Sequence, residues 1–216
     1  MISGISGLYA VTPDEPDDMK LTAQVHSALL GGARLVQYRN KRAEPALRHR
    51  QAKALLSLCR RHGVPLIIND HVELALEIGA DGVHLGSEDR SIAAARETLG
   101  ANSIIGASCY NLLENARSAQ RAGASYVAFG SFFSSSVKSG AAHAPVALLH
   151  EAKQELALPV VAIGGISHAN APRLIAAGAD SVAVISALFT AADIRIAARD
   201  FNALFPVNEQ AIRRRS

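Results

Sequence analysis

The stretch Pro65–Asp89, PLIINDHVELALEIGADGVHLGSED, decides the fold. It contains a short apolar run at Pro65–Asn69, a helical pattern at Val72–Ile78 closed by a glycine, and a second apolar run at Gly82–Leu85. Short apolar runs bounded by turn residues are typical of strands buried on both faces of a parallel sheet. The stretch therefore predicts a strand, a helix and a second strand that runs parallel to the first.

An aspartate follows each of these two strands. Asp70 and Asp89 would emerge on adjacent loops at the same end of a parallel sheet. Because Mg²⁺ is usually held by one or two carboxylates together with waters and a substrate phosphate, the pair predicts a magnesium site. The alternative is that each aspartate caps the helix after it, which is a common use of this residue. Ser91 is available to cap the second helix, and this favours the metal site.

The same alternation of strand and helix continues along the whole chain. Strands are predicted at Gly7–Val11, Arg34–Tyr38, Pro65–Asn69, Gly82–Leu85, Ser103–Ala107, Ser125–Phe129, Val160–Ile163 and Ser181–Ile185. Helices are predicted at Asp18–Leu30, Glu44–Arg61, Val72–Ile78, Ser91–Leu99, a segment capped by Asn111 that ends at Ala122, Pro145–Leu156, Ser167–Ala177 and Ala192–Leu204. Eight such units in 216 residues favour an α/β fold of the TIM (β/α)8 barrel type over an open doubly wound sheet.

The domain prediction is a single barrel over residues 1–205, followed by a basic tail, 206–216, expected to be flexible. With 49% hydrophobic and 19% charged residues, the composition is that of a soluble globular protein. A net charge of +3 is too small to indicate nucleic-acid binding, and no apolar run approaches the 18 residues of a membrane span. Two cysteines, Cys59 and Cys109, fit a reducing compartment, and a cytoplasmic location is expected.

In a barrel of this kind the site lies at the carboxyl ends of the strands, so polar residues there are the candidates. Gln37, Arg39 and Lys41 alternate after the second strand and would face the barrel mouth together, which suits a polyanion such as pyrophosphate. Solvated surface residues are the alternative. Asn69 and Ser108 add small polar groups. The long sixth loop, residues 130–144, is rich in hydroxyls and contains a lysine; a flexible polar linker is its alternative reading.

The seventh and eighth loops predict a second anion site. Gly164–Gly165 and Ile185–Ser186 stand where barrels of this class offer backbone N–H groups and a helix N-terminus to a phosphate. Two anion sites indicate two phosphorylated substrates, or one with two phosphorylated ends. Cations gathered around a pyrophosphate would stabilise it as a leaving group, which indicates a transfer reaction at the carbon that it leaves.

Several motifs together resemble the thiamine phosphate synthase family, also called thiamine-phosphate pyrophosphorylase. The resemblance covers nearly the whole chain and rests on VQYRNK, IIND, GVHLGSED, the Ser108 loop, FGSFFSSSVK, VAIGGIS and VAVISAL, in this order. It implies a transferase that joins 4-amino-2-methyl-5-(diphosphomethyl)pyrimidine to a thiazole monophosphate, or its carboxylated form. Pyrophosphate leaves first, the methylene cation is stabilised by the aminopyrimidine, and the thiazole nitrogen captures it to give thiamine phosphate.

The resemblance also implies roles for individual residues. Asp70 and Asp89 would bind Mg²⁺, the expected cofactor. The pyrimidine diphosphate would be held by Gln37, Tyr38, Arg39, Asn40, Lys41, Asn69, Ser108 and Lys138, of which Arg39, Lys41, Ser108 and Lys138 are the expected catalytic residues. The thiazole phosphate would be bound by Ser135, Ser136, Val137, Gly164, Gly165, Ile185 and Ser186. The expected partners are small phosphorylated substrates, with neither nucleic acid nor membrane, and a homo-oligomer is left open.

The sixth loop departs from the family pattern P-T/S-x-T-K. It reads Ser134–Lys138, SSSVK, with Val137 where a threonine is expected, so one side-chain donor to a phosphate is absent. Two other functions stay open: a related thiazole tautomerase, which is an isomerase on the same barrel, and an inactive barrel that only binds a phosphorylated ligand, of which Val137 would be the first sign. Retention of Asp70, Asp89, Arg39 and Lys138 argues against the tautomerase.

Overall fold

The computed structural model describes residues 5–86, 89, 91–134 and 144–206. The strands are β1 (Gly7–Val11), β2 (Leu35–Tyr38), β3 (Leu66–Asn69), β4 (Gly82–Leu85), β5 (Ile104–Tyr110), β6 (Tyr126–Phe129), β7 (Val160–Ile163) and β8 (Ser181–Val184). The helices are α1 (Asp18–Leu30), α2 (Pro45–His62), α3 (Val72–Ile78), α4 (Ile92–Leu99), α5 (Leu113–Arg121), α6 (Ala147–Glu155), α7 (Ala171–Ala176), α8 (Ser186–Phe189) and α9 (Ile194–Ala203).

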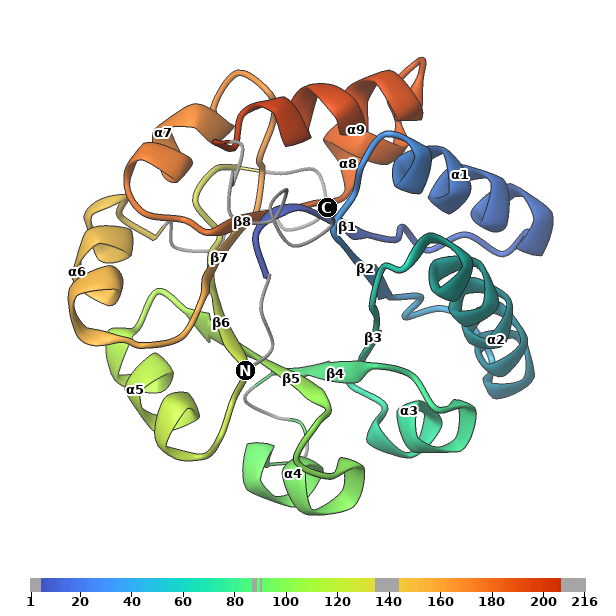
Figure 1. The fold of residues 1–216 in the computed structure, drawn as a ribbon, viewed down its shortest axis with the longest axis horizontal. Coiled ribbons are helices and arrows are strands. Elements are labelled where there is room, and N and C mark those ends of the chain that lie inside the picture. The colour runs from blue at the N-terminus through green and yellow to red at the C-terminus, as the bar shows by residue number, and fades with distance from the viewer. Residues whose placement is uncertain (1–4, 87–88, 90, 135–143, 207–216) are drawn as a thin grey trace, which may run out of the picture.

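The eight strands form a closed barrel in chain order, with every neighbouring pair parallel and β8 returning to β1. Figure 1 shows the strands as a central ring and the helices as an outer ring around it. This arrangement confirms the predicted TIM (β/α)8 barrel. Because all strands run the same way, their carboxyl ends and the loops that follow lie at one end of the barrel.

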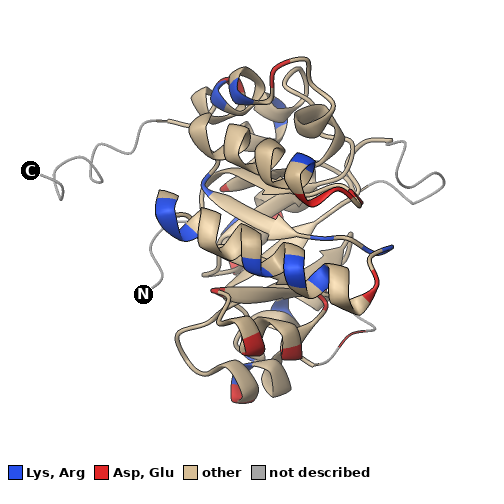
Figure 2. Ribbon diagram, turned by 90° about the vertical axis from the view of Figure 1, so that its right-hand side faces the viewer, with Lys and Arg blue, Asp and Glu red and all other residues tan. Residues whose placement is uncertain are grey.

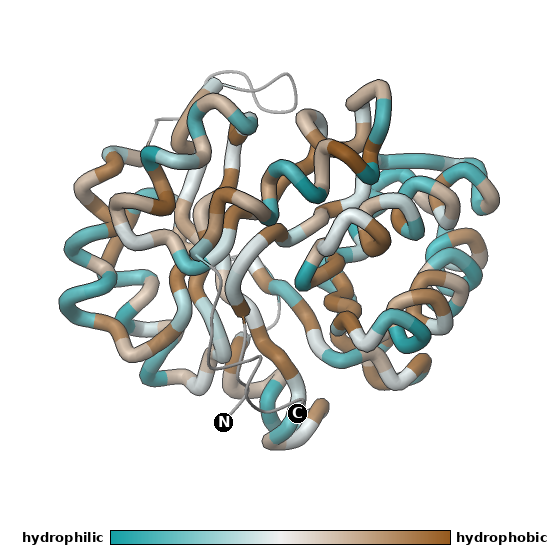
Figure 3. Tube along the Cα trace, turned by 45° about the horizontal axis from the view of Figure 1, so that its top comes forward, coloured by the Kyte–Doolittle hydropathy of each residue, from teal (hydrophilic) through white to brown (hydrophobic). Residues whose placement is uncertain are grey.

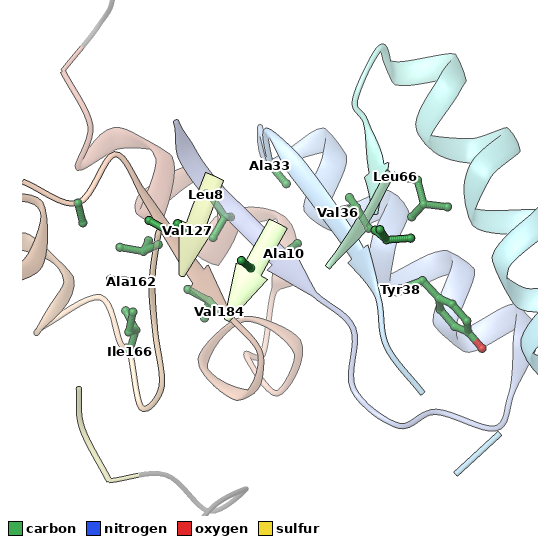
Figure 4. Packing of buried hydrophobic residues seen from close by; sticks show 14 of the residues in the cluster. Leu8, Ala10, Ala33, Val36, Tyr38, Leu66, Val127, Ala162, Ile166 and Val184 are labelled. Carbon is green, nitrogen blue, oxygen red and sulfur yellow. The ribbon is translucent and has the colours of Figure 1, made fainter. Parts of the chain in front are cut away.

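Apolar side chains form two layers, one on each side of the strand ring. The barrel interior is filled by a smaller cluster that includes Tyr9, Ile67, Tyr126 and Val161. The larger cluster lies between strands and helices, where Figure 4 shows side chains such as those of Leu8, Val36, Leu66, Val127 and Val184. The mainly hydrophobic strands and the mixed colouring of the helices in Figure 3 reflect this arrangement. Strands buried on both faces explain the continuous apolar runs in the sequence.

Several helix ends follow directly from the sequence. The Asp17 side chain accepts hydrogen bonds from the N–H groups of Met19 and Lys20 and so caps α1. The α2 helix begins at Pro45 and is capped after His62 by Gly63, whose φ of 63° is the left-handed conformation that glycine adopts readily. Ser91 accepts from the N–H of Ala94 and caps α4, as predicted.

Two predicted boundaries around β5 are wrong. The strand does not stop at Ala107 but continues to Tyr110, with a register shift between Ser108 and Tyr110 where it pairs with β6. Asn111 does not cap the next helix, because the cap position of α5 falls on Leu112, whose N–H donates to the carbonyl of Cys109. The extra residue in the bulged strand shifts the start of the helix by one position.

The segment after β7 and the segment after β8 also differ from the prediction. The helix expected from Ser167 begins only at Ala171, because the Asn170 side chain accepts from the N–H of Ser167 at 2.8 Å and donates to the carbonyl of Gly165 at 3.0 Å. Such local side-chain bonds hold a turn in place of a helix. The short helix α8, directly after β8, was not predicted.

Both charge signs occur on the surface. Figure 2 shows basic and acidic residues on the outer helices, which agrees with the small net charge of +3. Cys59 and Cys109 are both buried free thiols, and burial raises the pKa of each to about 12. Within the described ranges, none of the helices combines the length and the apolar character needed to cross a membrane.

Candidate functional site

A pocket of about 640 Å³ opens at the carboxyl ends of the strands. It brings together the following residues that the sequence predicted as site residues: Gln37, Arg39, Lys41, Asn69, Asp70, Asp89, Ser108, Gly164, Gly165, Ile185 and Ser186. Ser135, Ser136, Val137 and Lys138 lie outside the described residues. The loops of β2, β3, β4, β5, β7 and β8 thus converge on one volume, as expected for this fold.

Among the predicted site residues that the structure describes, Tyr38 and Asn40 do not line this pocket. The Tyr38 hydroxyl donates to Oε1 of Gln51 at 2.8 Å, and the Asn40 amide donates to the same atom at 3.1 Å and to the carbonyl of Glu15 at 3.0 Å. Both side chains therefore contact the α2 side of β2. The alternation that brings Gln37, Arg39 and Lys41 to the pocket places the two residues between them on the opposite face.

The two aspartates after β3 and β4 both line the pocket, and the carboxyl group of Asp89 acts on that of Asp70. Burial, followed by the neighbouring Asp89 carboxyl, raises the pKa of Asp70, while Lys41 and Arg39 partly counteract this. Lys41 Nζ lies 3.8 Å from Oδ2 of Asp70. Neither aspartate caps a helix, since Asp70 precedes the cap position of α3 at His71, and Ser91 caps α4.

Asp89 is held in place by a turn of its own loop. Its Oδ2 accepts from the N–H of Gly86 at 2.6 Å. Asp70 adopts φ 62°, a left-handed conformation that aspartate tolerates better than most residues and that is frequent at functional sites. In the described part of the chain, no cluster of three or more His, Cys, Asp and Glu side chains could hold a metal by itself. A cation here would need ligands from water or substrate in addition to the aspartates.

The cationic side of the pocket is fixed by residues of the β1 loop. Asp14 Oδ1 lies 3.2 Å from a guanidinium nitrogen of Arg39 and accepts from the backbone N–H of Lys41 at 2.9 Å. The Thr12 hydroxyl both accepts from the N–H of Arg39 and donates to its carbonyl, each at 2.8 Å. Thr12 and Asp14 therefore orient the basic segment. Neither residue is among the site residues predicted from the sequence.

The opposite side of the pocket is built from backbone. Ile185 stands at the cap position of α8, and the N–H groups of Ser186 and Ala187 precede the first backbone hydrogen bond of that helix. Gly164 and Gly165 approach the β6 loop so closely that an added Cβ would lie 2.2 Å from Ser131 and 2.5 Å from the Phe133 carbonyl, respectively. The helix N-terminus at this end comes from α8 and not from a helix directly after Gly165. Unbonded N–H groups at a helix start attract anions.

Sequence reasoning missed the residues at the pocket floor. His84, inside the apolar run of β4, contacts the Tyr126 hydroxyl through Nδ1 and the Ser108 hydroxyl through Nε2, each at 2.9 Å. Burial lowers the pKa of His84 to about 4, so the ring is neutral near pH 7. Gly106 makes room for Tyr126, since a Cβ there would lie 2.1 Å from the tyrosine ring. A polar residue within a buried strand is the feature that could have pointed to His84.

These features define a (β/α)8 barrel with a charged pocket at the carboxyl ends of its strands. A family model described as thiamine monophosphate synthase matches residues 8–188. The thiamine-phosphate synthase of Thiobacillus denitrificans is 58% identical over 199 residues, covering 92% of this chain and 94% of that protein. The thiamine-phosphate synthase of Methylobacillus flagellatus is 57% identical over 201 residues, covering 93% of this chain and 96% of that protein. The chain belongs to the thiamine monophosphate synthase family and is an enzyme.

Solved structures agree with this assignment. The thiamine phosphate pyrophosphorylase of Pyrococcus furiosus superposes with a TM-score of 0.82 at 36% identity, covering 92% of this chain and 94% of that chain. A 3-hexulose-6-phosphate synthase superposes with a TM-score of 0.71 at 16% identity, covering 92% of this chain and 99% of that chain. The second likeness shows the barrel fold alone, since one fold hosts many unrelated activities.

Proposed function

We propose that the chain joins 4-amino-2-methyl-5-(diphosphomethyl)pyrimidine to 4-methyl-5-(2-phosphoethyl)thiazole, or its carboxylated form, and releases pyrophosphate and thiamine phosphate. The observation that carries the proposal is the division of the pocket into two ends. One end has Arg39, Lys41 and the Asp70–Asp89 pair, and the other has the N–H groups of α8. Family membership at 58% identity supports the same reaction.

The aspartate pair supports a magnesium ion at the diphosphate end. Two neighbouring carboxyl groups repel each other when both are ionised, and burial together with this repulsion raises the pKa of Asp70. A hard divalent cation with oxygen ligands relieves the repulsion and neutralises charge on a diphosphate. Asp70 and Asp89 would hold it, and Asp14 and Thr12 would keep Arg39 and Lys41 turned toward the same phosphate groups.

The chain's own residues then favour departure of the diphosphate. The bond between the methylene carbon and the diphosphate oxygen breaks, and its electron pair stays on that oxygen, where Arg39 and Lys41 stabilise the developing charge. The thiazole nitrogen donates its lone pair to the methylene carbon and forms the new carbon–nitrogen bond. The α8 end would hold the thiazole phosphate so that the nitrogen faces this carbon. Lys138 and Val137 lie outside the described residues. Binding of the diphosphate by Lys138 and of the thiazole phosphate by Val137 stays a prediction.

The test is an assay of the purified protein with both substrates, with and without EDTA. Thiamine phosphate and pyrophosphate are expected to form in equal amounts, to stop when EDTA is added, and to resume with excess Mg²⁺. Isomerisation of a thiazole phosphate without any diphosphate substrate, unaffected by EDTA, would show a tautomerase instead. Binding of both ligands without product would show an inactive barrel.

A further inference from the structure

Among the described residues, a chain of hydrogen bonds crosses the barrel interior beneath the pocket. The Gln37 amide nitrogen donates to the Tyr9 hydroxyl at 2.7 Å, and the Tyr9 and Tyr126 hydroxyls lie 2.8 Å apart. Tyr126 then meets Nδ1 of His84, and Nε2 of His84 meets the Ser108 hydroxyl, each at 2.9 Å. The two ends of this chain, Gln37 and Ser108, both line the pocket.

The direction of every bond in the chain follows from the direction of the first. Each hydroxyl, and the neutral histidine ring, has one polar hydrogen to donate. The Tyr9 hydroxyl accepts from Gln37, so its own hydrogen goes to Tyr126, and the Tyr126 hydrogen goes to Nδ1 of His84. The histidine hydrogen is then on Nε2 and goes to the Ser108 oxygen. The hydrogen of Ser108 remains available to the pocket.

The chain of hydrogen bonds therefore has two ordered states. It couples the hydrogen-bonding role of Gln37 to that of Ser108. In the state just described, the Gln37 amide nitrogen is bound to Tyr9, so Oε1 is the acceptor that Gln37 can offer to a ligand, and Ser108 offers a donor. If the Gln37 amide turned over, every bond would reverse, and the pocket would meet an amide donor at Gln37 and an acceptor at Ser108. A mixed state leaves two donors or two acceptors facing each other inside the barrel, where an unmade hydrogen bond is costly.

Burial keeps the tyrosine hydroxyls and the histidine ring of this hydrogen-bond chain neutral, so that each has one polar hydrogen. Tyr9 and Tyr126 are 1% and 0% exposed. Desolvation raises the pKa of both tyrosines, and it lowers the pKa of His84 to about 4. The two-state ordering therefore holds over the neutral pH range.

We propose that Tyr9 and Tyr126 are positioning residues that set substrate specificity by forcing opposite hydrogen-bonding roles on Gln37 and Ser108. The inference rests on the proposed function, because the ring recognised there is an aminopyrimidine. An exocyclic amino group donates to Gln37 Oε1, while a lone pair of the same substrate accepts from Ser108. A 4-oxo ring offers an acceptor in place of the amino donor. To donate to this acceptor, the Gln37 amide must turn over, and every hydrogen bond of the chain must reverse. Ser108 then no longer donates to the lone pair of the ring.

The experiment measures binding of two pyrimidines that carry the same diphosphomethyl group, one 4-amino and one 4-oxo. Calorimetry with Mg²⁺ and without any thiazole gives a dissociation constant for each. The wild type should prefer the amino ring. In Tyr9→Phe, which retains the ring packing against Tyr126, Gln37 and Tyr126 lose the bond that fixes their direction. The ratio of the two dissociation constants should fall by about tenfold, because one neutral hydrogen bond changes a dissociation constant by about that factor.

Tyr126→Phe is the second variant and cuts the same chain at its middle, so the preference should fall there as well. Ser181→Ala is the matched control, because it removes a buried hydrogen bond from the first residue of β8 to the Gly7 carbonyl, at the end of the strand away from the pocket. This variant should leave the preference for the amino ring unchanged. Thermal melts confirm that each variant is folded. Combining Tyr9→Phe with Ser108→Ala should lower the preference by less than the product of the two single effects.

The outcomes separate the two proposals. If both tyrosine variants weaken the two pyrimidines equally, the tyrosines have only a structural role and this inference is wrong. Equal binding of the two rings by the wild type also overturns the inference, and it leaves the proposed reaction in place. If the wild type binds neither ring, the proposed function fails and the assigned specificity fails with it.

Discussion

Asp70 is the residue at which the requirements of folding and of the proposed function conflict. Its backbone is left-handed at φ 62°, and its carboxyl group lies partly buried beside that of Asp89. Both features cost free energy in the folded protein. Asparagine has the same shape and tolerates the same backbone, so Asp70→Asn removes the charge without the strain of most other substitutions.

Replacement of Asp70 or Asp89 by asparagine should lower turnover roughly a hundredfold at limiting Mg²⁺, because each removes a proposed metal ligand. Steady-state rates across a magnesium titration are the measurement. Asp200→Asn, an exposed carboxylate on α9, is the control and should have the wild-type rate. A wild-type rate in either site variant would remove the metal assignment.

Asp70→Asn should also stabilise the metal-free protein at pH 7. The pKa of Asp70 is raised above its ordinary value of 3.8, so ionisation in the folded state is disfavoured, and stability falls as the pH rises from that value through the folded pKa. The variant should therefore melt at a higher temperature than the wild type at pH 7 in EDTA, and the gain should shrink toward pH 4. An unchanged melting temperature at pH 7 would mean that neither burial nor the Asp89 carboxyl disfavours ionisation of Asp70 in the folded protein.

Asp14 acts on the site through the basic segment. Asp14→Asn keeps an acceptor for the Lys41 N–H but removes the charge beside Arg39, whereas Asp14→Ala removes both. The KM for the pyrimidine diphosphate should rise by about threefold in the first variant and by about tenfold in the second, with little change for the thiazole phosphate. Saturation curves for each substrate test this. Equal effects on both substrates would show that Asp14 only supports the fold.

At the scale of single elements, α8 and the bulged end of β5 shape the pocket. The four residues of α8 place two backbone N–H groups at the end opposite the aspartates. The extension of β5 brings Ser108, Tyr110 and Asn111 to the pocket wall. Both are short irregular features at the carboxyl ends of strands, where barrels carry function.

A negative charge in the first turn of α8 should compete with the thiazole phosphate. Ala187→Glu should raise the KM for the thiazole phosphate at least tenfold, because the carboxylate would occupy the N–H groups and repel the phosphate. Ala192→Glu adds the same charge at an exposed position after α8 and is the matched control. If KM for the diphosphate rises instead, the two ends of the pocket are assigned the wrong way round.

At the scale of the whole molecule, the polar groups that cross the barrel interior make stability depend on pH. His84 is 8% exposed and has a pKa of about 4 in the folded protein against 6.5 for a free histidine. Above pH 6.5 the ring is neutral in both states and the contribution to stability is complete. Between pH 6.5 and 4 the unfolded chain binds a proton that the folded chain does not, so stability is lost as the pH falls.

The unfolding free energy that is lost through His84 on acidification should reach about 3 kcal/mol near pH 4, since each pKa unit corresponds to about 1.4 kcal/mol. Urea unfolding of the wild type and of His84→Gln at several pH values measures it. The variant should be less stable at pH 7 but should lose less stability on acidification. If the unfolding free energies of wild type and His84→Gln change in parallel with pH, the His84 ring has the same pKa in the folded and the unfolded protein.

The sequence by itself determined the order of the elements and most of the predicted pocket. Apolar runs ended by a glycine, a charged residue or a hydroxyl residue marked each strand, and the periodicity of two placed Gln37, Arg39 and Lys41 on one face. The chemistry of a strand end is local to the chain, so motifs such as IIND and VAIGGIS were readable without coordinates.

Only the tertiary structure decided which residues meet across the barrel. The contact of Asp14 with Arg39, and the chain that links Gln37 to Ser108 through Tyr9, Tyr126 and His84, join residues far apart in sequence. No local pattern encodes them, because the positions of inward side chains depend on barrel closure and on the register of neighbouring strands. The helix α8 and the bulge in β5 were missed for a related reason, since packing and not propensity sets such short features.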